Sequence, residues 1–285
     1  MPRTTPTPAG GRLPSFLIIG APKAGTTTLA AYLDAHPDVF VAREKEVHYF
    51  DTNFSRGLDW YRSRFIGAMS ERAVGEASPT YMYATQRLER IAATLPKARL
   101  IAVLRDPVDR AYSHYWWQHA IGESRSFEDA VRAEMRGEWH EGRPKRYLDG
   151  GRYRRYLEDV GRYFPRDALH VVTLEDLRRE PAQTFSEVCR FLGVDGSFVP
   201  PNLGEVRNPA YRLRSPRLRR LMFRTRAWRR LPSGVAERID AWNRVPFRYP
   251  DLDPALRSEL RAWFADADAE LAGWLGRPLP WRQPA

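Results

Sequence analysis

The sequence contains a single cysteine and has no apolar run long enough to cross a membrane. Cys189 lies in a helical pattern with Phe185 and Leu192, where a small buried hydrophobic residue is expected, so a disulfide framework is excluded. No stretch reaches the roughly 18 consecutive apolar residues of a membrane helix. Residues 1–14 are rich in Pro, Thr and Gly and lack the apolar core of a signal peptide. We therefore expect a cytoplasmic protein with a disordered N-terminal tail over residues 1–14.

Acidic residues are scarce relative to basic ones. The 285 residues carry 46 Lys and Arg against 35 Asp and Glu, and the net charge of +11 favours anionic ligands. A hydrophobic content of 43% is sufficient for a sizeable core, and the length fits one large α/β domain. Internal repeats and clusters of metal-ligating residues are both missing. We expect one domain over residues 15–285, without a metal.

The most informative stretch is a strand followed by a glycine-rich turn and a helix start. Phe16–Ile19 is apolar without alternation, as in a strand buried on both faces, and the turn from Gly20 to Gly25 has the span of a phosphate-binding loop. A nucleotide triphosphatase has lysine directly after the second glycine, then a magnesium-binding Ser or Thr, whereas here Lys23 lies inside the turn and Thr26 follows Gly25. The pattern indicates an anion site without a metal. Its candidate ligands are Lys23, Ala24, Gly25, Thr26, Thr27 and Thr28.

A charged and aromatic segment, residues 43–51, offers two titratable side chains that could accept a proton, Glu46 and His48. In an extended backbone these two side chains would point to opposite sides, so only one of them would face a substrate. A charge run is commonly a solvated surface. Glu46 could therefore belong to loop solvation, and His48 could be a satisfied polar residue among aromatics.

A second buried strand with a polar end is expected at residues 99–104. Arg105 follows it, and Asp106 with the proline after it is a strong helix-start signal. On that helix, Ser113 shares a face with Arg110. A guanidinium at a strand end and a hydroxyl on the next helix indicate a second anion site. The alternative is that Arg105 pairs with a core carboxylate and Ser113 is an ordinary helix residue.

Strands and helices alternate along the rest of the chain, as in an α/β fold. Apart from those already named, we expect strands at residues 39–41, 73–81 and 168–174, the second of them leading into a loop, and helices at residues 57–65, 84–94, 153–164, 181–192 and 254–275.

Three segments together resemble the sulfotransferases that use 3′-phosphoadenosine 5′-phosphosulfate (PAPS): Gly20–Thr28, Glu46–Asp51 and Arg105–Tyr115. The resemblance is strongest to the heparan-sulfate-type, or carbohydrate, branch in a bacterial-like cytoplasmic version. It implies a single α/β domain with a mostly parallel sheet of about four or five strands, helices on both faces and a P-loop-like 5′-phosphosulfate loop. One departure is Ala77, where the family often has a lysine, so no second catalytic lysine is expected.

The resemblance also implies roles for individual residues. Lys23 would stabilise the leaving phosphate, Glu46 would be the general base, and Arg105 and Ser113 would bind the 3′-phosphate of PAPS. Chemistry keeps His48 as a rival base, because the unperturbed pKa of histidine is the more convenient one. Arg110 also matches a position of the 3′-phosphate motif. A family loop that covers the adenosine matches residues 200–214 loosely and supplies further candidates, which are Arg207, Arg212 and Arg214.

The expected activity is transfer of a sulfuryl group to a hydroxyl or amine of a carbohydrate, glycolipid or secondary metabolite. Nine arginines and no acidic residue lie between Tyr211 and Arg230, so the segment Arg212–Arg230 is either an anionic-acceptor or membrane-surface face or a solvated helix. No nucleic acid partner is expected. Two other functions stay open: a P-loop-type small-molecule kinase, and a non-catalytic protein that binds anions or nucleic acid.

Overall fold

The computed structural model describes residues 11–44, 46–138, 147–205, 211–215, 217–218, 221–222 and 234–283. They belong to two compact units, and each is described by itself. The first unit takes its described residues from Met1–Asp106, Arg152–Arg207 and Ala265–Ala285, and the second from Pro107–Gly151 and Asn208–Phe264. Arg207 is outside the described residues, as is most of the segment Arg212–Arg230.

A five-stranded sheet forms the centre of the first unit, in the order β2-β3-β1-β4-β5, with every neighbouring pair parallel. The strands are β1 (Phe16–Gly20), β2 (Val39–Val41), β3 (Ala73–Ala77), β4 (Arg99–Leu104) and β5 (Leu169–Thr173). The predicted α/β class and the predicted number of strands are therefore confirmed.

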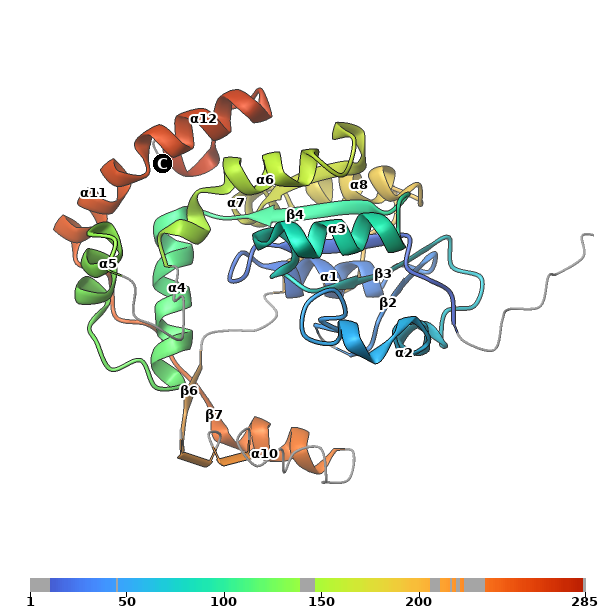
Figure 1. Cartoon of the computed structure of the whole chain (residues 1–285), viewed down its shortest axis with the longest axis horizontal. Coiled ribbons are helices and arrows are strands. Elements are labelled where there is room, and N and C mark those ends of the chain that lie inside the picture. Colours follow the sequence, from blue (N-terminus) through green and yellow to red (C-terminus); the bar gives the residue numbers. More distant parts are fainter. Residues whose placement is uncertain are drawn as a thin grey trace, which may run out of the picture. The chain divides into compact units, whose positions relative to one another are not determined.

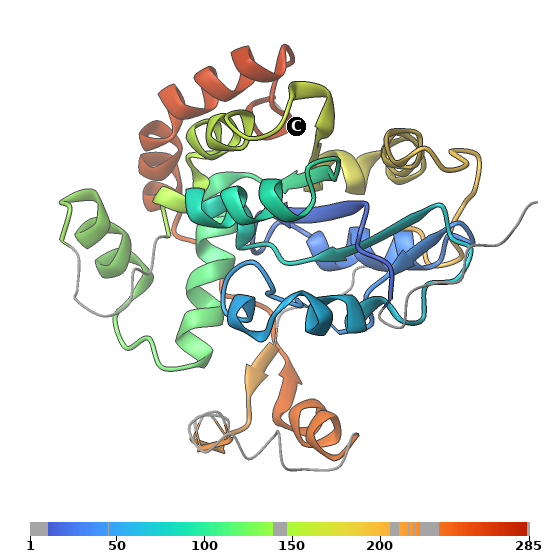
Figure 2. The same cartoon turned by 45° about the vertical axis from the view of Figure 1, so that its right-hand side comes forward.

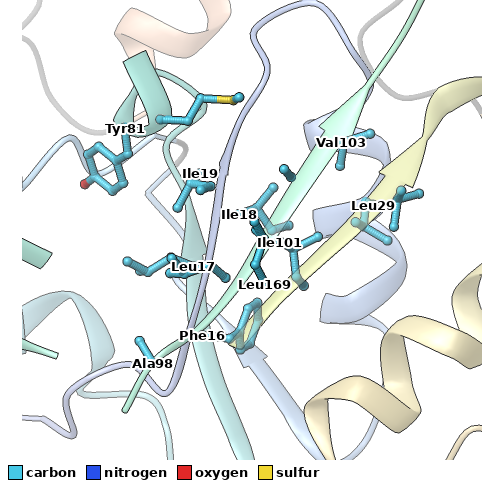
Figure 3. Close-up of a cluster of buried hydrophobic side chains, with 14 of the residues drawn as sticks. Phe16, Leu17, Ile18, Ile19, Leu29, Tyr81, Ala98, Ile101, Val103 and Leu169 are labelled. Atoms are coloured by element: carbon cyan, nitrogen blue, oxygen red, sulfur yellow. The ribbon is translucent and has the colours of Figure 1, made fainter. Parts of the chain in front are cut away.

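The central strand β1 is buried along its whole length, as its unbroken apolar run predicts. Figure 3 shows the consequence: Leu17 and Ile19 point to the side of Tyr81, whereas Ile18 points to the side of Leu29. All five of these side chains are fully enclosed. The sheet thus has a hydrophobic core on each face.

Helices cover both faces of this sheet (Figures 1 and 2). Helices α1 and α8 pack together through an edge-on contact of Tyr32 with Phe185, and α3 and α6 contact each other on the opposite face. The helices of this unit are α1 (Thr26–Asp34), α2 (Leu58–Arg62), α3 (Thr85–Thr94), α6 (Tyr153–Gly161), α7 (Leu174–Arg179), α8 (Pro181–Leu192) and α12 (Ala265–Leu275). The connection after β1 leads to β2 on one side of the sheet, and the connection after β4 leads to β5 on the other side, so the connections diverge between β1 and β4. In open α/β sheets such a divergence marks the ligand-binding crevice.

The second unit is mainly helical and has its own apolar core, to which Val108, Tyr115, Phe127, Leu260 and Phe264 contribute. A short antiparallel sheet of β6 and β7, which the sequence did not predict, lies in the same unit. The elements of this unit are α4 (Pro107–Ala120), α5 (Phe127–Met135), α10 (Val235–Asn243), α11 (Pro254–Trp263), β6 (Tyr211–Leu213) and β7 (Arg244–Pro246).

Several boundaries differ from the prediction: for example, β3 ends at Ala77 and α6 at Gly161, and larger differences concern the N-terminal tail and the last helix. The disordered tail was expected to reach residue 14, but Gly11 is buried and Arg12 donates from Nη1 to the Glu71 carbonyl at 2.7 Å. Residues 11–14 are thus packed, and residues 1–10 lie outside the described part. The last helix was expected to be continuous over residues 254–275. It is two helices, α11 and α12, which meet at Phe264, where the chain passes from one unit to the other.

Within the described residues, no helix combines the length and the apolar character that a transmembrane span needs.

Candidate active site

The 20–25 loop, residues Gly20–Gly25, joins β1 to α1 and ends in a left-handed turn. Gly25 has φ of 95°, and a Cβ there would come within 2.7 Å of the Leu174 side chain, so glycine is required for both conformation and space. Lys23 also has a positive φ, of 71°. The turn leads directly into the N-terminus of α1, and the N-terminal end of a helix favours an anion. The predicted strand, glycine turn and helix start are therefore present, and the role of the loop as an anion site stays a prediction.

Arg105 lies next to this loop at the end of β4. Its Nη1 donates to the carbonyl oxygen of Lys23 at 3.2 Å, and its own carbonyl accepts from the Tyr153 hydroxyl at 2.9 Å. The following N–H, of Asp106, donates to Oε1 of Glu175 at 3.0 Å. These bonds hold a guanidinium beside the 20–25 loop at the β1–β4 divergence. Arg105 is consequently both a candidate anion ligand and a brace for the loop that carries Lys23.

The 46–51 loop, residues Glu46–Asp51, follows the carboxyl end of the edge strand β2 and brings three titratable side chains together. Nε2 of His48 lies 3.1 Å from Oε2 of Glu46, and Nδ1 lies 3.0 Å from Oδ2 of Asp51. The Thr80 hydroxyl donates to the same Asp51 oxygen at 2.8 Å. The imidazole is therefore held between two carboxylates, with Glu46 the most exposed of the three side chains at 38% and Asp51 the least at 7%.

The two carboxylates decide the charge of this imidazole. Burial by itself lowers the pKa of His48, but the hydrogen bonds and negative charges of Asp51 and Glu46 outweigh it and raise that pKa from 6.5 to about 10. For the acid Asp51 burial acts in the opposite direction and raises the pKa. Hydrogen bonds from His48, Thr52 and Thr80 outweigh burial and lower the pKa of Asp51 to about 2. At neutral pH the arrangement is an imidazolium between two carboxylates.

The backbone of this loop differs from the extended conformation that we considered. Glu46 and His48 have φ of 58° and 51°, so both are in the left-handed region, where alternation of side chains across a strand does not apply. The expectation that the two side chains point to opposite sides is therefore wrong, since they are hydrogen-bonded to each other. Sequence reasoning missed Asp51 and Thr80. The only signal for Asp51 was its spacing of three residues from His48, and the sequence carried no signal for Thr80.

The other predicted ligands lie in the second unit or outside the described residues. Ser113 is buried in α4. Arg110 is fully enclosed, and its guanidinium donates to the Tyr147 carbonyl, so this side chain has a structural role. Arg212 is exposed, whereas Arg214 donates from Nε to the Trp242 carbonyl at 2.9 Å. Arg207 is not described. The roles of Ser113, Arg207, Arg212 and Arg214 as cofactor ligands stay predictions.

Comparison with known proteins places the chain in a family. The family model of the sulfotransferase domain matches residues 13–208. Bifunctional heparan sulfate N-deacetylase/N-sulfotransferase 3 of Mus musculus is 30% identical over 94% of this chain and 31% of its own length. The Homo sapiens protein of the same name is 35% identical over 64% of this chain and 22% of its own. A sulfotransferase crystal structure from Alicyclobacillus acidocaldarius superposes with a TM-score of 0.70 at 28% identity, covering 95% of this chain and all of that one.

The chain belongs to the PAPS-dependent sulfotransferase family, which confirms the resemblance drawn from the three sequence segments. It spans about a third of the length of the mouse relative.

Proposed function

We propose that the protein transfers a sulfuryl group from PAPS to an acceptor hydroxyl or amine, with Glu46 as the general base. The observation that carries the proposal is the Glu46–His48–Asp51 arrangement after the carboxyl end of β2, in the same parallel sheet whose strand β1 leads into the 20–25 loop. Glu46 is the most exposed member of the three and is held by an imidazole that is itself anchored by the buried Asp51. A carboxylate held in this way can take a proton from an acceptor, which is a poor nucleophile while it keeps that proton.

The residues of the chain fit this donor. When bound, PAPS supplies a sulfur atom whose bond to the bridging phosphate oxygen breaks as a bond to the acceptor forms. The Lys23 ammonium, the loop N–H groups and the hydroxyls of Thr26, Thr27 and Thr28 stabilise the negative charge left on that phosphate. The acceptor proton moves to Oε2 or Oε1 of Glu46. We keep Arg105 as a ligand of the 3′-phosphate.

His48 serves this reaction as a cation. Its raised pKa of about 10 keeps it protonated at neutral pH, so it cannot take a proton there and instead orients the Glu46 carboxylate. This assignment favours Glu46 over His48 as the base.

The acceptor is proposed from the relatives. Two of them are named as N-sulfotransferases of heparan sulfate, so amino and hydroxyl groups of carbohydrates come first, followed by glycolipids and secondary metabolites. An anionic acceptor would suit the net charge of +11. Membrane-surface contact through Arg212–Arg230 and a cytoplasmic location stay predictions.

Incubation with radiolabelled PAPS and a panel of these acceptors tests the proposal, with Glu46→Gln as the control. We expect label in at least one acceptor with the wild type and far less with the variant. Calorimetry should show binding of 3′-phosphoadenosine 5′-phosphate (PAP) in preference to ATP. Binding of ATP alone would support the kinase instead, and PAP binding without transfer to any acceptor would support a non-catalytic binder.

A further inference from the structure

A fully buried carboxylate lies beneath the 46–51 loop and has no part in the reaction as proposed so far. Glu76, near the end of β3, is 1% exposed. It accepts hydrogen bonds from three hydroxyl groups, those of Ser78 at 2.6 Å, Tyr81 at 2.8 Å and Tyr61 at 3.2 Å. Burial strongly disfavours a carboxylate, and it raises the pKa of Glu76 to about 7 against the effect of these three donors and of the charge on His48.

Two of the three hydroxyl groups also accept hydrogen bonds from backbone N–H groups of the 46–51 loop. The N–H of His48 donates to the Ser78 hydroxyl oxygen at 3.0 Å, and the N–H of Phe50 donates to the Tyr81 hydroxyl oxygen at 3.4 Å. Two chains of hydrogen bonds thus start at alternate residues of the loop, His48 and Phe50, and end at the two carboxylate oxygens of Glu76. Among the described residues, the Tyr61 hydroxyl bonds Glu76 alone, while its ring stacks on Tyr49 at a centroid distance of 4.2 Å.

The chemistry of a carboxylate explains why this residue type suits the position. While Glu76 is ionised, its carboxylate only accepts hydrogen bonds, so both hydroxyl protons then point at Glu76. Their oxygen lone pairs are then left for the loop N–H groups. An amide at position 76 would place an NH₂ against one of these hydroxyls and compete with the loop N–H for its oxygen.

The loop needs such support because its backbone is unfavourable by itself. Glu46 and His48 both have positive φ although neither is a glycine, and such residues persist only where their surroundings hold them. The His48 N–H, which Ser78 fixes, belongs to the same residue whose imidazole orients Glu46.

We propose that Glu76 is a positioning residue for the transfer reaction. Through the hydroxyls of Ser78 and Tyr81 it holds the 46–51 loop in the conformation that presents Glu46 to the acceptor. This inference rests on the proposed function, because the loop is catalytic only if Glu46 takes the acceptor proton.

Two measurements on the full chain test it together. Hydrogen exchange of the His48 and Phe50 amides, followed by NMR, reports the anchoring without any assumption about the reaction. The turnover number kcat and the dissociation constant of PAP, measured on folded protein well below the melting temperature, separate positioning from loss of fold. The variants are Ser78→Ala, Tyr81→Phe and Glu76→Gln, so the proposal stays testable if the buried Gln variant does not fold.

Loss of one buried hydrogen bond should accelerate exchange by about tenfold, at His48 in Ser78→Ala and at Phe50 in Tyr81→Phe. Glu76→Gln should accelerate at least one of the two. In all three variants we expect kcat to fall about tenfold while the Kd of PAP changes less than about twofold.

Tyr61→Phe is the matched control, since it removes a hydroxyl from the same carboxylate oxygen and keeps the ring stacked on Tyr49. The fall in kcat caused by Tyr61→Phe should be several-fold smaller than the fall caused by Tyr81→Phe. Equal effects of these two variants, or unchanged exchange and kcat in folded Ser78→Ala and Tyr81→Phe, would overturn the positioning role. A wild-type chain that transfers nothing would overturn the proposed function instead, and the exchange data would still decide whether Glu76 anchors the loop.

Discussion

The 20–25 loop and the 46–51 loop both follow carboxyl ends of strands in one parallel sheet, yet they are held in different ways. The 20–25 loop is fixed by backbone hydrogen bonds, such as Ala21 N–H to the Val103 carbonyl at 2.7 Å and Ala24 N–H to the Ala21 carbonyl at 3.2 Å. The 46–51 loop is held by side chains that belong to residues about 30 positions later, Ser78 and Thr80.

This difference separates a candidate binding loop that is held mainly by its backbone from a candidate catalytic loop that is held by side chains. The glycine, the helix N-terminus and these backbone hydrogen bonds define the shape of the 20–25 loop, and the Arg105 guanidinium braces it at the Lys23 carbonyl. The conformation of the 46–51 loop depends on the charges of Glu46, His48 and Asp51 and therefore on pH. Variants in the first loop should lose activity with an unchanged fold, whereas variants in the second should change activity and stability together.

Lys23→Ala should have the largest effect. On the proposed role of Lys23, removing its ammonium should lower kcat by about a hundredfold to a thousandfold, with the fold intact because the half-buried lysine supports charge rather than packing. Steady-state kinetics and circular dichroism check both parts. Lys97→Ala, at an exposed lysine, is the matched control. Undiminished turnover of the Lys23 variant would remove its role in stabilising the leaving group.

Glu46→Gln should lower kcat by roughly a hundredfold, because the amide keeps the shape of the side chain but cannot take a proton. PAP affinity should be nearly unchanged. His48→Asn should cost much less, since it removes the orienting cation but leaves the base. Rates of sulfuryl transfer for both variants decide the assignment. A Gln variant that keeps most of its turnover, beside an Asn variant that loses it, would make His48 the base.

Arg105→Ala should weaken PAP more than an analogue that lacks the 3′-phosphate, by about 1.5–3 kcal/mol, which is the range for a hydrogen bond to a charged group. A smaller loss common to both nucleotides is also expected, because the same guanidinium braces the carbonyl of Lys23. Calorimetry with the two nucleotides measures the difference. Equal losses would leave Arg105 with the bracing role alone.

Stability should depend on His48 in a defined pH window. Its pKa in the folded state is raised from 6.5 to about 10, so its contribution is fully present below about pH 6.5 and is lost as pH rises through 10. Asp51, with its pKa lowered from 3.8 to about 2, contributes above about pH 3.8. Urea unfolding should therefore show His48→Asn destabilised by about 1–3 kcal/mol near pH 6. The difference should shrink by pH 10, and a difference independent of pH would contradict the ion pairs.

The fold was predictable because it depends on local patterns. The unbroken apolar runs of β1 and β4 predict strands buried on both faces, and the second of them ends where predicted, at Leu104. Gly193, with φ of 75°, ends α8 as expected. The break at Phe264 was missed because the residues on both sides of it continue a helical pattern, and only tertiary packing separates α11 from α12.

The candidate site was predictable only in part, because only some of its residues are marked by local patterns. Lys23 and Gly25 are marked by glycine spacing, and Arg105 by its place after a strand. The contact of Glu46 with His48 could not be predicted, because it depends on two left-handed residues that carry no glycine signal. The support from Glu76 requires strand β3 to lie beneath a loop about 30 residues earlier in the sequence, which no local pattern specifies.

The most direct test of the account is the protonation state of His48, measured by ¹⁵N NMR titration of the imidazole in the full chain. The account predicts that both ring nitrogens carry a proton throughout pH 6 to 8.5 and that the ring loses its proton only near pH 10, because Glu46 and Asp51 hold it as a cation. A neutral ring at pH 7.5 that titrates near its ordinary value of 6.5 would contradict the account, since His48 would then be free to act as the base.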